Sequence, residues 1–146
     1  MSDLSDFLRK KQQDYEQEQM NWQNVKEQWQ QQVREFMDQI NSWLKPLVQE
    51  QLLNVQEGEI CLDEEHIGSY ATSTLEIVIG GERIKIQPVG RLIIGALGRI
   101  DISSSKGSYI VLYHEQQGWI YRNAHRREPF TVFNENNFME LIRELA

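Results

Sequence analysis

The chain has 146 residues, 40% of them apolar, and its 22 Asp and Glu outnumber 15 Lys and Arg to give a net charge of −7. This composition excludes collagen, a disulfide-stapled miniprotein and a wholly disordered chain, and the acidic charge argues against bulk affinity for nucleic acid or anionic lipid. The longest apolar runs, such as residues 92–94, are too short for a membrane span. The acidic N-terminal residues and the single Cys61 predict a cytoplasmic protein without an intramolecular disulfide.

The composition changes sharply near Gly58. Residues 1–57 contain 13 glutamines, one proline and no glycine, whereas residues 58–146 contain all nine glycines. Such a change marks a boundary between kinds of structure. We therefore expect a helical segment over 1–57 and an antiparallel sheet with a C-terminal helix over 58–146.

The helical segment carries a regular apolar pattern. One large apolar residue recurs every seven positions, as Leu8, Tyr15, Trp22, Trp29, Phe36 and Trp43. A denser pattern on the same face continues from Val33 to Val55, which predicts one amphipathic helix from about residue 4 to 56. We expect a kink near Pro46 and a stop at Gly58.

This predicted helix is too long for the rest of the chain to cover. At 1.5 Å per residue it would extend for roughly 80 Å, whereas a globule of the remaining residues would span about 30 Å. We therefore expect residues 33–56 to pack on the domain and the residues before them to extend away.

The aromatic residues of the extended part predict an interaction surface. Tyr15, Trp22, Trp29 and Phe36 are the expected anchors, because large aromatic side chains dominate the binding energy of protein interfaces. The partner would be a second copy of the chain or another protein, held through residues 1–45. Two alternatives stay open: a helical hairpin with a bend near 21–24 or 41–42, and a disordered front end.

The clearest strand signal is a hairpin over 74–79 and 82–87 around Gly80-Gly81. Pairing Ile79 with Glu82 places apolar residues opposite each other on one face. On the other face it places Glu76 opposite Lys85. Cross-strand pairs of this kind stabilise a sheet, so this register is predicted.

Further strands are expected at 59–64, 91–97 or part of it, 99–103, 108–114, 119–122 and 130–132. Residues 134–145 predict a helix capped by Asn134, with the apolar face Phe138, Leu141, Ile142 and Leu145. The predicted fold class is α+β: a long N-terminal amphipathic helix, an antiparallel meander of five to seven strands, and a C-terminal helix packed on the sheet.

Two groups of residues could suggest a cofactor or metal site. Gly90, Gly95 and Gly98 lack the spacing of a phosphate-binding loop, so a bulge or tight bend is expected there. The run from Asp63 to His66 has ligand residue types, but adjacent strand residues face opposite ways and no partner motif follows. Neither a cofactor nor a metal nor a specific small molecule is therefore predicted.

One basic cluster stands out, formed by Arg122, His125, Arg126 and Arg127 beside Trp119 and Tyr121. Basic and aromatic side chains together could bind phosphates and bases of single-stranded nucleic acid. A nuclease would also need a second group, for which His114 and Glu115 are the candidates. A charged turn that pairs with the acidic helices explains the same residues.

No pair of residues forms a recognisable catalytic motif, so the sequence favours a non-catalytic function. We expect a protein–protein interaction or adaptor module that self-associates or binds a partner through its aromatic N-terminal helix. A phosphate-directed RNA-binding protein or nuclease that uses the basic cluster is the alternative.

Overall fold

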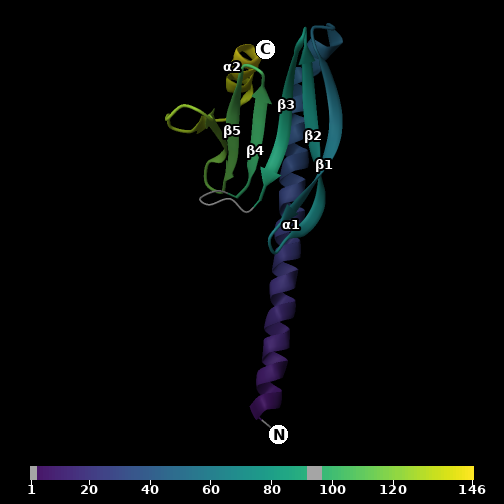
Figure 1. Cartoon of the computed structure of the whole chain (residues 1–146), viewed down its shortest axis with the longest axis vertical. Coiled ribbons are helices and arrows are strands. Elements are labelled where there is room, and N and C mark those ends of the chain that lie inside the picture. The colour runs from purple at the N-terminus through teal and green to yellow at the C-terminus, as the bar shows by residue number, and fades with distance from the viewer. Residues whose placement is uncertain (1–2, 92–96) are drawn as a thin grey trace.

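A computed structural model describes residues 3–91 and 97–146 of the chain. Two helices and seven strands follow one another as α1 (Asp3–Gln49), β1 (Asn54–Glu64), β2 (Gly68–Ile79), β3 (Glu82–Gly90), β4 (Arg99–Ser104), β5 (Gly107–His114), β6 (Gly118–Asn123), β7 (Thr131–Val132) and α2 (Glu135–Leu145). The strands form one antiparallel sheet in the order β1-β2-β3-β4-β5-β6-β7. The α+β fold predicted from the sequence is thereby confirmed (Figure 1).

The predicted hairpin between β2 and β3 has the expected register. Ile79 pairs with Glu82, Ile77 with Ile84, Leu75 with Ile86, Glu76 with Lys85, and Val78 with Arg83. The two inner pairs, Ile77 with Ile84 and Leu75 with Ile86, face the core, where each side chain is at most 3% exposed. The alternation of apolar and charged residues therefore determined both the pairing and the buried face.

The end of α1 differs from the prediction. The helix passes through Pro46 but stops at Gln49, and residues from Asn54 onward, including Val55, belong to strand β1. Gln51 adopts a left-handed conformation with a φ of 60°, and the Leu52 N–H donates to the Leu47 carbonyl at 3.0 Å. This is a Schellman cap, in which Gln51 takes the place usually held by glycine. The boundary between helix and sheet therefore lies before Gly58.

The core lies between one face of the sheet and the two helices. The sheet contributes inward side chains that are 0% exposed, and α1 contributes a stripe from Trp29 to Leu44. The fully buried inward sheet residues are Ile77, Ile84, Ile86, Ile100, Ile102 and Val111. The helix α2 lies beside α1, since the rings of Trp43 and Phe138 are 5.6 Å apart. One continuous apolar core therefore unites the helices with the sheet.

The C-terminal half of the meander matches its predicted strands. Those expected at 99–103, 108–114 and 119–122 correspond to β4, β5 and β6, and the strand expected at 130–132 is the shorter β7. The sequence places another strand over 91–97, which falls mainly on residues 92–96 and so outside the described residues.

Helix α2 begins as its sequence predicts. The Asn134 side chain accepts a hydrogen bond from the Asn137 N–H at 2.9 Å, and Phe138, Leu141, Ile142 and Leu145 are buried. Because an N-cap side chain satisfies a helix N–H that otherwise has no partner, Asn134→Ala should lower the free energy of unfolding by about 1 kcal/mol. Urea unfolding followed by circular dichroism measures this. Asn136→Ala, an exposed change inside the same helix, is the control, and an equal loss in both variants would contradict the capping role.

Candidate interaction site

The first 19 described residues of α1 extend beyond the rest of the molecule. We call residues 3–21 the arm, and the remaining described residues the body. Figure 1 shows the arm as a continuous helix that leaves the body at the lower end of the sheet. Every arm residue except Ser5 is exposed, and at 1.5 Å per residue the arm is about 28 Å long. The hairpin alternative is therefore wrong, because α1 has no break near 21–24 or 41–42.

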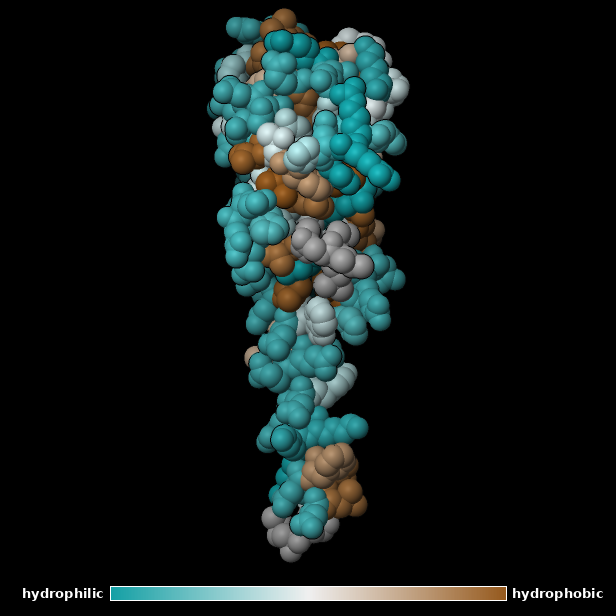
Figure 2. All heavy atoms as spheres, turned by 90° about the vertical axis from the view of Figure 1, so that its left-hand side faces the viewer, coloured by the Kyte–Doolittle hydropathy of each residue, from teal (hydrophilic) through white to brown (hydrophobic). Residues whose placement is uncertain are grey.

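Four of the five large exposed apolar residues of the arm lie on one side of the helix. At 100° per residue, Leu4, Phe7, Leu8 and Tyr15 fall within an arc of about 100°. They are 62%, 61%, 51% and 62% exposed, respectively. Figure 2 shows apolar side chains gathered near the free end of the arm, with hydrophilic residues along most of its length. The arm thus presents an apolar stripe to solvent.

This arm stripe continues the face that the body buries. The same arc contains Trp29, Phe36, Ile40 and Leu44 farther along α1, and these four side chains are at most 3% exposed. Met20 is as exposed as Tyr15, at 61%, but it lies on the opposite side of the arm. One helical face is therefore core in the body and open surface in the arm.

Trp22 lies at the junction between arm and body. Its ring stacks on His66 with centroids 4.8 Å apart and an interplanar angle of 8°. His66 is at the tip of the β1–β2 hairpin, where it adopts a φ of 69° and Gly68 a φ of 83°. The hairpin tip thus contacts α1 at the point where burial of the helix begins.

The four predicted anchors therefore separate into three environments. Tyr15 is exposed and Trp22 is half-buried, but Trp29 and Phe36 are 0% and 3% exposed within the body. The prediction that Trp29 and Phe36 contact a partner needs correction, because their own sheet covers them. Packing of α1 on the sheet also begins before Val33, the residue at which the sequence predicts it to start.

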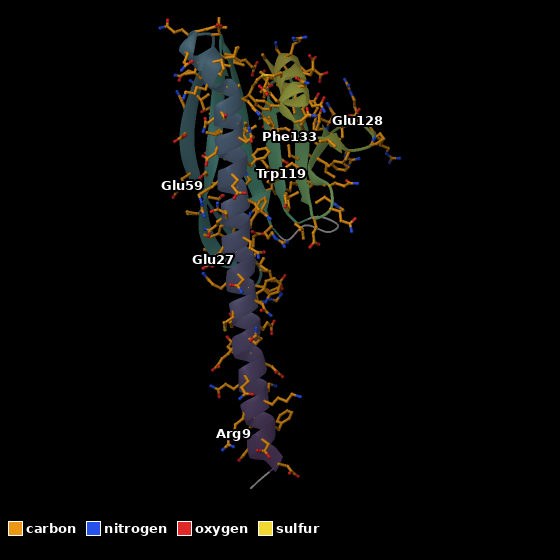
Figure 3. The ribbon with its side chains drawn as sticks, turned by 180° about the vertical axis from the view of Figure 1, so that it is seen from behind. Arg9, Glu27, Glu59, Trp119, Glu128 and Phe133 are labelled. Atoms are coloured by element: carbon orange, nitrogen blue, oxygen red, sulfur yellow. The ribbon has the colours of Figure 1, made fainter. Side chains whose placement is uncertain are left out.

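An aromatic groove that the sequence did not indicate runs between α1 and the end of the sheet. Figure 3 shows Trp119 and Phe133 beside α1. The ring centroid of Phe36 lies 4.6 Å from that of Trp119 and 5.2 Å from that of Phe133. The groove has a volume of about 290 Å³ and is also lined by Glu35 and Trp43. Its rings come from distant parts of the chain, so no local pattern could have assembled it.

The basic cluster occupies the connection between β6 and β7. His125, Arg126 and Arg127 are exposed there, whereas Arg122 is half-buried and lies 4.8 Å above the Phe130 ring. A carboxylate is part of the same connection, since Glu128 accepts a hydrogen bond from the Asn123 N–H at 3.1 Å.

The structure does not bring His125 near the groups proposed for a nuclease. His114 pairs with Gly118 at the start of β6, whereas His125 follows Asn123 at the other end of that strand. Six strand residues at about 3.3 Å each separate the two ends. The connection therefore offers exposed cations without a catalytic partner from His114 or Glu115.

At the acidic end of β1, the Glu64 carboxylate accepts hydrogen bonds that hold neighbouring parts of the fold together. Tyr70 donates its phenolic O–H to Glu64, and the Arg91 N–H donates to the same carboxylate at 2.8 Å. Burial, together with the Glu64 carboxylate, raises the pKa of Tyr70, and burial lowers the pKa of the Arg91 guanidinium. Among the described residues, no group of three or more His, Cys, Asp or Glu side chains could hold a metal ion.

A second hydrogen bond between a tyrosine and a carboxylate connects α2 to the sheet. Tyr109 of β5 donates its O–H to Glu144, and burial and this carboxylate raise the pKa of Tyr109 to about 12. The Ser104 hydroxyl donates to the Leu145 carbonyl at 2.8 Å. Both contacts hold the C-terminal helix in place.

The chain matches no protein-family model, no curated protein and no solved structure. Over the part of the chain that the structure describes, no helix is both long enough and apolar enough to cross a membrane. The exposed surface of the molecule is therefore the guide to its function.

Proposed function

We propose that this protein is a non-catalytic interaction module that associates with a second copy of itself through the arm stripe. One observation carries the proposal: the helical face that is buried from Trp29 onward continues through the arm as exposed apolar side chains. Burial of a large apolar side chain is worth about 1.5–3 kcal/mol. The arm of a second copy carries the same apolar side chains and could bury those of the first.

The position of the stripe supports association rather than a place in the protein's own core. The sheet lies beside α1 only from Trp22 onward, and the helix continues away from the sheet as the arm (Figure 1). The arm residues outside the arc are mostly polar or charged. This distribution is typical of a helix that pairs along one side and faces solvent on the other.

The test replaces stripe residues with aspartate. Leu8→Asp with Tyr15→Asp should convert a dimer of the full chain to a monomer, because a buried anchor contributes on the order of 2 kcal/mol and each copy loses two. We expect the dissociation constant to rise at least about 100-fold. Sedimentation equilibrium over a range of concentrations measures it.

The matched control places the same charges on the opposite side of the arm. Gln13→Asp with Met20→Asp removes an equally exposed apolar residue and should leave the dimer intact. Circular dichroism should show an unchanged sheet and unfolding midpoint in both variants. A wild-type chain that is monomeric, or a control that dissociates as readily as the stripe variant, would overturn the proposal.

A further inference from the structure

The order of residues along the stripe is nearly the same, in chemical character, when read from either end. Followed from the tip past the arm to residue 26, the arc contains the apolar residues Leu4, Phe7 and Leu8, then Lys11, Tyr15 and Glu18, then the apolar residues Trp22 and Val25, and finally Lys26. Leu8 and Lys26 lie at one edge of the arc. Within these edge residues, apolar residues occupy both ends of the stripe from Leu4 to Val25, a base and an acid lie inside them, and Tyr15 is near the middle. The stripe therefore has a midpoint between residues 14 and 15.

We propose that two arms pair antiparallel about a two-fold axis beside Tyr15, an inference that rests on the self-association proposed above. In this arrangement, Lys11 of each copy faces the other copy's Glu18, and Tyr15 lies next to its own symmetry mate. A two-fold interface must be self-complementary, and this register satisfies that requirement. At the two ends it brings apolar residues together: Leu4 meets Val25, and Phe7 meets Trp22.

A parallel arrangement in register lacks this complementarity. Lys11 would face Lys11 and Glu18 would face Glu18, so both charged positions of the stripe would oppose like charges across the interface. Like charges placed directly opposite each other destabilise helical pairs, whereas opposite charges in these positions set partner orientation. The charges of the stripe therefore select the antiparallel orientation.

The body sets the limit of the overlap. Val25 and Lys26 are half-buried, and Trp29, the next residue of the arc, is 0% exposed. An incoming arm can thus follow the stripe only as far as about Val25. Leu4 and Val25 are 21 residues apart, which is about 31 Å of helix. The free end of one copy would then lie beside the junction of the other, where Trp22 stacks on His66.

Disulfide trapping tests the orientation. In a Cys61→Ser background, which removes the exposed native thiol, the full chain carries either Leu4→Cys or Val25→Cys. Under mild oxidation, an equimolar mixture should form cross-linked heterodimers. Each variant alone should form at least tenfold less cross-linked product, because the antiparallel register places identical positions far apart.

Charge reversal gives an independent measurement on the same chain. Lys11→Glu should weaken the dimer about three- to tenfold, since two solvent-exposed ion pairs are lost and two acidic pairs replace them. Adding Glu18→Lys should restore the wild-type affinity. In a parallel dimer, Lys11→Glu merely exchanges one like-charge pair for another and should leave the affinity unchanged.

The possible results distinguish a failure of self-association from a failure of the antiparallel orientation. A monomeric wild-type chain overturns self-association itself. A dimer in which Leu4→Cys cross-links on its own overturns only the orientation and indicates a parallel pair. A dimer that resists trapping in the mixture and is unaffected by Lys11→Glu also overturns the antiparallel register.

Discussion

Trp29→Ala should lower the free energy of unfolding by about 3–5 kcal/mol, the cost of removing a large side chain from a packed core. Trp29 is 0% exposed, and its ring lies 6.2 Å from that of Trp119. Removing it leaves a cavity between α1 and the sheet, which relaxation fills only in part. Urea unfolding monitored by circular dichroism gives the value.

Trp22→Ala is the matched control on the same helix. Trp22 is half-buried and stacks on His66. In samples dilute enough to be monomeric, where no Phe7 from a second copy covers this ring, the expected loss is about 1–2 kcal/mol. Equal losses at the two positions would contradict the assignment of Trp29 to the core and Trp22 to the junction. Comparable stability of Trp29→Ala and the wild type would indicate that a partner, and not the sheet, covers this face.

Gly98→Ala should destabilise the protein by about 1–3 kcal/mol, the cost of overpacking a well-filled core. A Cβ atom at Gly98 would lie 2.2 Å from the Cζ3 atom of Trp29. The backbone cannot easily retreat, because the Gly98 carbonyl accepts a hydrogen bond from the Tyr113 N–H at 3.0 Å. The indole and its neighbours must therefore shift. Thermal or urea unfolding measures the loss.

Two comparisons isolate this contact. Gly81→Ala introduces the same methyl group where no atom lies within 4 Å, so it should change stability by less than about 0.5 kcal/mol. In a Trp29→Ala background, the cost of Gly98→Ala should largely disappear, because residues in direct contact give non-additive effects. Additive costs in the double variant would show that Gly98 is required for a reason other than the indole.

The parts of the fold that could be predicted from sequence are those set by local patterns. The register of β2 with β3 follows from the turn at Gly80-Gly81 and from alternating apolar and charged residues on both strands. The start of α2 follows similarly from Asn134 and the apolar face behind it. Each of these elements contains within itself the residues that determine it.

The end of α1 could not be predicted, because its stop signal has no distinctive residue. Gln51 ends the helix in a conformation that usually indicates glycine, and the apolar spacing continues without interruption into Val55. Those later residues satisfy a helical period and a strand period equally well. Pairing of Val55 with Ile77, a contact made across the fold, decides between the two.

The candidate site was predicted only in part for a related reason. A seven-residue spacing identifies residues that share a face, but it does not say which surface covers them. Trp29 and Phe36 have the same spacing as Tyr15, yet the sheet buries the first two and leaves the third exposed. Phe7 lies on the same face, three residues after Leu4, but it is not part of the seven-residue repeat and so was not predicted as an anchor. Only the length of the sheet determines where the buried face ends.

The continuity of α1 has a thermodynamic consequence for any encounter with the arm. Nucleating a helix is costly, whereas extending an existing one costs little. In α1 the residues packed in the core supply the nucleus, and the arm merely propagates it. A partner therefore meets side chains already arranged on a formed helix. Little backbone conformational entropy remains to be lost on binding, and more of the energy of apolar contact is retained as affinity.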